Sequence, residues 1–317
     1  MNPMKTDIEE NDTAGIEEEM IFPTIKLTKE IKEAVKGLGK AEVRYLVDTY
    51  YQRQNDRIRS AGQMRALEQG ADHGPAKSGV LAWLHGHEEA LEGQLKLALG
   101  HYAKNDPVGK WLLDIKGIGP VIAAGLLSHL DIEKAPTAGH FWNFAGMNPG
   151  TTWDKGQKRP WNAKLKVLCF KIGESFVKCQ GRDGAFYADQ FTARKAFEIE
   201  RNDNGYFAEH AKAKEYAKST EAWPWVNGCY PAGTCGQMAG LDLKGRAQLL
   251  KDLRVEPGLG QRMIPPAHVH SIARRWVVKL FLSHLHAFWF ENHFGVKAPE
   301  PYAISILGHA HKIERPK

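Results

Sequence analysis

The chain is poor in cysteine and has no long hydrophobic run. Its 4 cysteines among 317 residues are too few for the disulfide framework of a secreted domain, so we expect a reducing, cytoplasmic setting. No charge-free apolar run reaches the ~18 residues that a membrane-spanning helix needs, and no basic-then-apolar leader opens the sequence. Lys279, His284 and His286 interrupt even the most apolar stretch. We therefore expect no membrane partner.

Positive charge is scarce at the start of the chain and abundant afterwards. Residues 1–20 hold one lysine against seven acids, a net charge of −6, whereas the whole chain carries +6. Residues 21–317 therefore carry +12. A basic body behind an acidic segment is compatible with a polyanionic partner such as nucleic acid, although many basic proteins bind none.

Alternation at period two is also missing, so the sequence predicts a mainly α fold. We expect an acidic disordered tail over residues 1–20 and then a helical arm over 21–106. Two long apolar-periodic helices, near 41–68 and 80–104, form this arm as a coiled-coil-like hairpin. Such hairpins often dimerise, so we expect a homo-oligomer.

The rest of the chain is expected in three parts. Residues 107–182 combine a glycine-rich turn between two short helices with a basic helix. Residues 183–264 contain charged helices and an insertion rich in glycine, proline and tryptophan, to which we assign no structure. Residues 265–317 begin at Pro265 and Pro266 with a long, apolar, buried helix and end in a basic tail.

The run KGIGPVIAAGLLSHL, residues 116–130, is typical of a helix–hairpin–helix. Gly117 and Gly119 allow a tight turn and close approach of another chain, and Pro120 suits the first position of a helix. The free N–H groups of that helix start favour an anion, most often a DNA phosphate, with Ile118 as the apolar anchor. The alternative is an ordinary tight turn between packed helices.

A basic stretch follows the turn. Residues 155–182 hold eight basic side chains and one acid, with Trp153 and Trp161 in or beside them. Basic side chains neutralise phosphates and aromatic rings stack on bases, whereas the alternative is a solvated helix face with two core tryptophans. The predicted nucleic-acid contacts are Lys116, Gly117, Ile118, Gly119, Lys155, Lys158, Arg159, Trp161, Asn162, Lys164 and Lys166.

Residues 111–150, from WLLDIKGIGP to FAGMNPG, resemble the C-terminal transposase domain of the insertion-sequence 110 family (the 110/116/902 group). The resemblance covers the G-I-G-P hairpin, the aromatic-Ala-Gly segment at 144–149 and the basic segment at 159–166, and extends over roughly residues 80–180. It implies DNA recombination by a mobile element or phage. It also implies DNA as partner, with structured RNA as a second partner.

Two departures weigh against carrying over the family's catalysis. Its full-length members place a metal-binding nuclease domain first, whereas residues 1–106 are helical and polar. They also bring a nucleophilic serine, whereas Thr151 and Thr152 stand in the loop after Pro149. A threonine hydroxyl can attack phosphorus, so both residues are retained as weak catalytic candidates. The resemblance therefore implies DNA binding and leaves the catalytic residues unknown.

The fourteen histidines offer a metal alternative. His268, His270, His284 and His286 lie as two His-x-His pairs on the long helix, where residues two apart point to different sides. Their spacing is not a recognised zinc pattern. We assign no firm metal or cofactor, and keep Mg or Zn at these histidines as an alternative.

Three hypotheses remain from the sequence. The first is a transposase-related DNA-binding protein that acts without cleavage. The second is an active recombinase or metal-dependent nuclease that uses the histidines and acids such as Asp131, Glu133 and Asp154. The third is a structural oligomer built on the arm, in which the glycine turn serves only packing.

Overall fold

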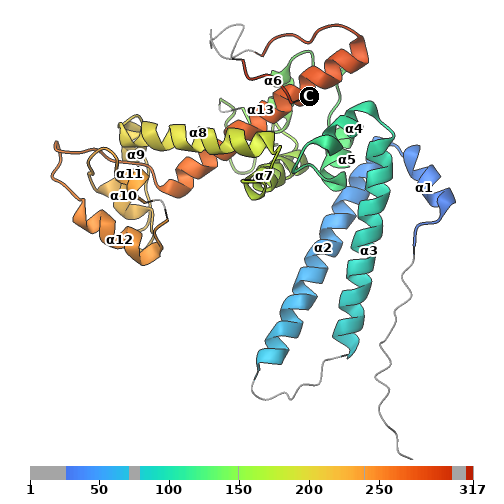
Figure 1. Ribbon diagram of the computed structural model, residues 1–317, viewed down its shortest axis with the longest axis horizontal. Helices are drawn as coiled ribbons and strands as arrows, with labels where there is room; N and C mark the ends of the chain where they lie inside the picture. The colour runs from blue at the N-terminus through green and yellow to red at the C-terminus, as the bar shows by residue number, and fades with distance from the viewer. Residues whose placement is uncertain (1–25, 71–78, 149, 239, 302–311, 317) are drawn as a thin grey trace, which may run out of the picture. The chain divides into compact units, whose positions relative to one another are not determined.

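The computed structural model describes residues 26–70, 79–148, 150–238, 240–301 and 312–316. These residues are mainly helical, as the sequence predicts, and form no strand (Figure 1). The first five helices are α1 (Lys29–Lys36), α2 (Lys40–Gln69), α3 (Gly79–Lys104), α4 (Pro107–Asp114) and α5 (Pro120–His129). The next four are α6 (Ala138–Phe144), α7 (Ala163–Lys178), α8 (Phe186–Asp203) and α9 (Ala208–Lys212). The last four are α10 (Trp223–Asn227), α11 (Thr234–Gln237), α12 (Leu243–Asp252) and α13 (Pro266–Phe294). The predicted acidic tail and most of the basic tail lie outside the described residues.

The chain divides into two compact units, and the boundaries fall inside α2 and α3. One unit contains residues 52–94, and the other contains residues 27–51 and 95–317. The two long helices run antiparallel (Figure 1).

In the unit of residues 52–94 the two helices meet through polar side chains. Arg53 Nη1 lies 2.9 Å from Glu88 Oε1, and Arg57 Nε lies 2.6 Å from Glu92 Oε2. Both glutamate side chains are 11% exposed. This part of the arm therefore contains two ion pairs whose glutamates are largely buried and whose arginines are partly exposed, whereas the sequence predicts a coiled-coil-like hairpin of apolar-periodic helices.

The larger unit has its core where α13 crosses α6, α7 and α8. Phe176, Tyr187 and Phe281 are fully buried there, with the Phe176 and Tyr187 rings stacked at 4.9 Å. A second apolar cluster joins Val43 and Val47 of α2 to Leu99 of α3. The long buried helix that the sequence predicts thus forms the centre of this unit.

The glycine- and tryptophan-rich insertion folds as short helices around its own small core. Trp225, Tyr230 and Met263 are buried in it. Asp203, at the end of α8, accepts hydrogen bonds from Cys235 N at 2.6 Å and Gly236 N at 3.0 Å, which fixes the start of α11. Contacts of this kind connect residues far apart in sequence, so local patterns could not reveal them.

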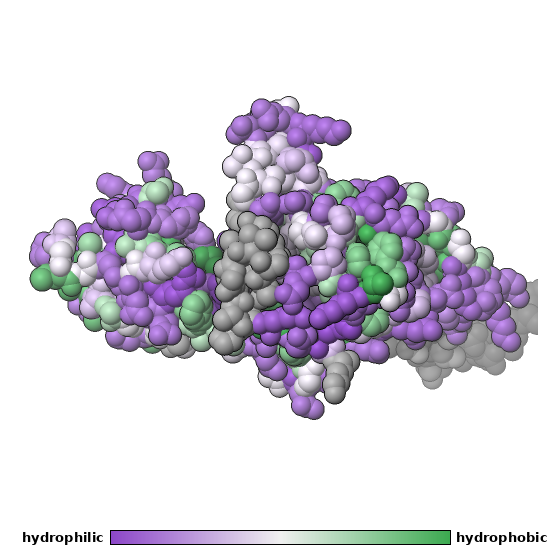
Figure 2. All heavy atoms as spheres, turned by 90° about the horizontal axis from the view of Figure 1, so that it is seen from above, coloured by the Kyte–Doolittle hydropathy of each residue, from purple (hydrophilic) through white to green (hydrophobic). Residues whose placement is uncertain are grey.

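None of the helices in the described ranges is long and apolar enough to cross a membrane. Hydrophilic residues predominate on the face of the molecule in Figure 2, and hydrophobic residues form small patches among them.

Candidate nucleic-acid interface

The turn between α4 and α5 has the geometry that its sequence requires. Asp106 caps α4 by accepting a hydrogen bond from Val108 N at 2.7 Å. Gly117 adopts φ of 101°, a left-handed conformation that favours glycine, and a Cβ there would lie 3.0 Å from the Phe176 ring. Ser175 Oγ donates to Gly117 O at 2.6 Å. Ile118 is 4% exposed, so its side chain is buried, and the contacts of Gly117 place the turn against α7.

The start of α5 is open. Its N-cap is Gly119, which has no capping side chain, and the first residue is Pro120. A Cβ at Gly119 would meet nothing within 4 Å. The first N–H groups of a helix have no partner within it and carry partial positive charge. This end of α5 can therefore accept an anion without rearrangement of the backbone.

Lys116 is placed differently from the other predicted contacts. Its ammonium group donates to the carbonyl oxygen of Asp183, in the segment that precedes α8. The side chain therefore ties the turn to that segment, and the backbone of the turn, rather than Lys116 Nζ, is left for a ligand.

The opposite end of α5 is surrounded by cations from α2. Arg44 Nη1 donates to Ser128 O at 2.8 Å, and Lys40 Nζ donates to Leu130 O at 3.1 Å. These cations satisfy carbonyl groups at a helix C-terminus, where positive charge is stabilising. Sequence patterns could not identify this role, because α2 and α5 are about 80 residues apart in the chain.

Asn162 joins the start of α7 to the same end of α5. Its side chain caps α7 by accepting from Leu165 N at 3.0 Å, and its Nδ2 lies 3.4 Å from Nδ1 of His129. Lys164 forms an ion pair with Asp48 of α2. Asn162 and Lys164 thus have structural partners in addition to any ligand contact.

His129 should make the fold sensitive to acid. Burial, followed by the charge of Arg44, lowers the pKa of His129 to about 4, with Asp48 opposing and Lys164 adding to the shift. Because this pKa lies below that of the unfolded chain, stability is present above pH ~6.5 and is lost as the pH falls towards 4. We expect a loss of about 2 kcal/mol in the free energy of unfolding between pH 7 and pH 4.5.

Urea denaturation at both pH values, for the native chain and His129→Asn, measures this contribution. The asparagine side chain keeps a polar group near the Nδ1 position but does not titrate. The native chain should therefore lose about 2 kcal/mol more than the variant on acidification. Equal losses in both proteins would contradict the assignment.

The basic segment, residues 155–166, begins in a loop and continues into α7. Lys155, Lys158, Arg159 and Lys166 are exposed, and none of them forms an ion pair with a described acid. Two of them lie over indole rings: Arg159 Cζ is 4.9 Å from the Trp153 centroid, and Lys166 Nζ is 4.0 Å from that of Trp161.

The two indoles also hold the loop together. Trp153 and Trp161 meet edge to face at 6.5 Å, and Trp153 Nε1 donates to Gln157 O at 2.7 Å. Trp161 packs directly on Gly146 of the aromatic-Ala-Gly segment. The loop is thus a folded platform that presents cations.

The turn and the basic segment lie at opposite ends of α7. Asn162, at its start, is near the last residue of α5, whereas Ser175, thirteen residues on, contacts the turn. At 1.5 Å per residue the two features are about 20 Å apart along the helix. Lys164, Lys171 and Lys178 follow one another at seven-residue spacing along α7 and share a face of it.

Among the described residues, neither catalytic candidate has a partner that would activate its hydroxyl group. Thr151 is half-buried and Thr152 is exposed, both in the loop before the basic segment. In the described part of the chain neither hydroxyl is hydrogen-bonded to a histidine or a carboxylate. A nucleophilic hydroxyl needs such a base, so this geometry supplies only part of a catalytic site.

The four candidate metal-binding histidines are separated by the fold. His284 Nδ1 contacts Tyr187 Oη at 2.9 Å and its Nε2 contacts Ile313 O at 2.8 Å, so both ring nitrogens are occupied. His286 Nε2 contacts Ala135 O at 2.7 Å. His268 and His270 pack beside the rings of His210 and Phe191, respectively. Across the described ranges no three histidine, cysteine or acidic residues gather as a metal site.

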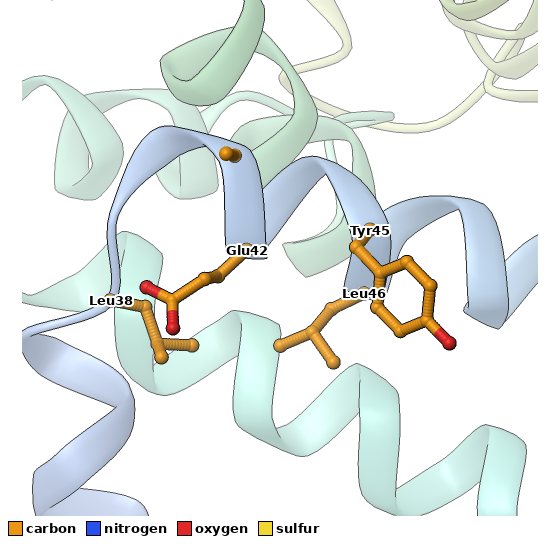
Figure 3. Close-up of a pocket in the computed structure, with 5 residues that line it drawn as sticks. Leu38, Glu42, Tyr45 and Leu46 are labelled. Atoms are coloured by element: carbon orange, nitrogen blue, oxygen red, sulfur yellow. The ribbon is translucent and has the colours of Figure 1, made fainter.

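A shallow hollow of about 490 Å³ lies where α1 joins α2 (Figure 3). Leu38, Tyr45 and Leu46 line it with apolar surface. Its one carboxylate, Glu42, accepts a hydrogen bond from Gly39 N at 2.8 Å and so serves the start of α2. The hollow thus brings together no pair of groups suited to acid–base or nucleophilic chemistry.

Comparison with known proteins bears on the turn and the loop. Residues 109–159 match the family model described as Transposase IS116/IS110/IS902 family. The match begins in α4, includes the turn and α5, and ends at Arg159 in the basic segment. No curated protein and no solved structure matches the chain. Residues 109–159 are therefore similar to part of the transposase domain of the IS116/IS110/IS902 family, and this similarity supports a function related to transposition.

Proposed function

We propose that this protein binds the phosphate backbone of DNA during transposition of a mobile element or phage. The observation that carries the proposal is the set of four exposed cations, Lys155, Lys158, Arg159 and Lys166, without acidic partners in the described ranges. Three of them lie inside the segment that matches the transposase family. Unpaired cations on a folded platform release counterions when they meet phosphates, which favours binding without reading sequence.

The turn at Gly119 provides a second contact to the same duplex. It lies about 20 Å from the basic segment, which corresponds to roughly six base pairs at 3.4 Å each. The lysine face of α7 connects the two, since Lys171 lies between them and Lys178 lies one turn beyond Ser175. A backbone that follows α7 would meet positive charge along this whole length.

Salt titration of binding tests the proposal. A labelled 20-base-pair duplex, a four-way junction and a structured RNA would each be titrated between 50 and 300 mM salt, with and without Mg²⁺. Binding of DNA that weakens steeply with salt supports the proposal. Tighter binding of the structured RNA than of either DNA would make RNA the ligand instead of DNA. Absence of binding at every salt concentration would refute the proposal. A denaturing gel of the same samples would reveal strand cleavage or joining.

Gly119→Val tests the turn separately. The extended backbone of Gly119 and the open space around it accept a valine, so the fold should survive with at most ~1 kcal/mol lost at the helix cap. The isopropyl group would cover the N–H groups at the start of α5. We expect duplex affinity to fall about fivefold, the equivalent of about 1 kcal/mol.

Fluorescence anisotropy measures that affinity, and thermal unfolding of the same sample serves as the control. Unchanged affinity in a folded Gly119→Val protein would show that the turn serves only packing.

A further inference from the structure

A second line of cations lies on α13, on a different side from α7. His268, Arg275 and Lys279 are seven and four residues apart, so they share one stripe of the helix. Arg274 points towards α7, where it pairs with Glu174. Adjacent residues on a helix differ by about 100° around its axis, so the stripe at Arg275 is turned away from the side of α13 that carries Arg274 and meets α7.

Two neighbouring elements extend this stripe. Arg194 of α8 lies with its Cζ 5.0 Å from the ring centroid of Trp276, next to Arg275 in sequence. His210 of α9 has its ring 5.2 Å from that of His268, and Lys214 follows shortly after. We call the set the α13 cationic face: Arg194, His210, Lys214, His268, Arg275 and Lys279.

Within the ranges that the structure describes, acidic groups do not balance the charge of this face. Glu198 is fully buried and pairs with Arg194, but it also pairs with Arg201, so two cations share one carboxylate. Lys214, Arg275 and Lys279 form no ion pair with any acid in the described ranges. Nε of Arg194 is buried and has no hydrogen-bond partner among the described residues.

The cations are close enough to repel one another. Burial, and then the charges of Arg194 and Arg275, lower the pKa of Lys279. Burial, and then His210, Arg275 and Lys214, lower the pKa of His268. Like charges held together without counter-charge destabilise a fold, and a bound anion would relieve that repulsion.

The dimensions of the face favour an extended anion over a small one. From His268 to Lys279 it runs about 16 Å along α13, long enough for about five phosphates of one strand. Small-molecule sites are concave and gather their polar groups at one point, whereas these cations are spread along one side of a helix. Spaced cations on a helix surface match the regular phosphates of a nucleic-acid backbone.

We propose that the α13 cationic face binds a second phosphodiester segment, so that one protein molecule holds two DNA segments at once. The face itself is independent of the proposed function, because none of its residues lies in the basic segment or the turn. Only the first of the two segments rests on that proposed function.

Bridging of two duplexes provides the test. Two 20-base-pair duplexes, one carrying a donor dye and one an acceptor, would be mixed with the full chain, and energy transfer between them would report bridging. Anisotropy of a single duplex would report binding. The face variant is Lys214→Glu with Arg275→Glu, since both side chains are exposed and unpaired. The matched control is Lys244→Glu with Lys251→Glu, two exposed lysines on α12.

The native chain and the control should both give energy transfer. The face variant should lose about nine-tenths of it, yet bind a single duplex through the basic segment within about threefold of the native affinity. The milder pair Lys214→Gln with Arg275→Gln serves if the reversal prevents folding, and should weaken bridging in the same direction.

Three results would overturn the inference: no energy transfer with the native chain, full transfer with a folded face variant, or an equal loss in the control. If instead a dimer bridged two duplexes through its two basic segments alone, the folded face variant would keep full energy transfer. The proposed function fails by a separate result, namely unchanged single-duplex affinity after Lys155, Lys158 and Arg159 are removed.

Discussion

Replacing Lys155, Lys158 and Arg159 together by alanine is expected to lower the affinity for duplex DNA about 100-fold at 0.1 M salt. Each exposed cation that neutralises a phosphate contributes about 1 kcal/mol under these conditions, so three contribute about 3 kcal/mol. The plot of log affinity against log salt should also become shallower by about 2.7, because each lost phosphate contact removes about 0.9 from its slope. All three side chains are exposed and unpaired, so the fold should remain intact.

A second triple variant separates local contact from net charge. Lys26, Lys29 and Lys32 lie in and before α1, and their replacement by alanine removes the same three charges from the protein. If the basic segment binds DNA, this control should change affinity by less than about threefold and leave the slope nearly unchanged. Equal losses in the two variants would mean that only overall charge attracts DNA and would refute the interface.

The features that were predicted correctly from sequence are those that depend on local chemistry. The turn needs a glycine where φ is 101°, and Pro120 starts the next helix because its missing N–H is not needed there. Each of these depends on residues within four positions of one another, so a short pattern contains the whole physical reason.

The features that could not be predicted depend on how distant helices meet. The sequence places Lys116 and the basic segment in one stretch, but α5 and α7 run antiparallel, which separates them by the length of α7. The ammonium group of Lys116 is used by a carbonyl 67 residues away. His129 and Arg44 come together only because α2 packs on the end of α5. No local pattern specifies such contacts.

In the arm, the helices were predictable from sequence but the faces that they bury were not. Its leucines predict an apolar seam, but Leu84 and Leu91 are 40% and 47% exposed, whereas Glu88 and Glu92 lie in the seam with their arginine partners. Leucine and glutamate both favour helices, so the helix was predictable and its orientation was not. These ion pairs align the two helices only because each glutamate meets an arginine on the other helix. The sequence shows the charged residues, but it does not show which arginine meets which glutamate.

Gly109→Ala is expected to destabilise the fold by at least about 3 kcal/mol, even though alanine is the better helix former by up to ~1 kcal/mol. Gly109 lies in α4 at the first residue of the family match, and its backbone packs on the end of α3. A Cβ at this position would clash with the carbonyl oxygen of Ala103 and lie 2.8 Å from its carbonyl carbon. Because these are backbone atoms, no side-chain rotation can relieve the contact, and α4 must move away from α3.

Gly93→Ala is the matched control, because Gly93 also lies inside a helix but has nothing within 4 Å of a Cβ. It should stabilise the protein by about 0.5–1 kcal/mol through helix propensity alone. Urea denaturation of both variants gives the two free energies. A displaced α4 also moves the turn that begins after it, so Gly109→Ala should weaken DNA binding under conditions where the variant is still folded. Equal stability of Gly109→Ala and Gly93→Ala would show that α3 and α4 do not pack closely, and the turn would then lose the support that holds it in place.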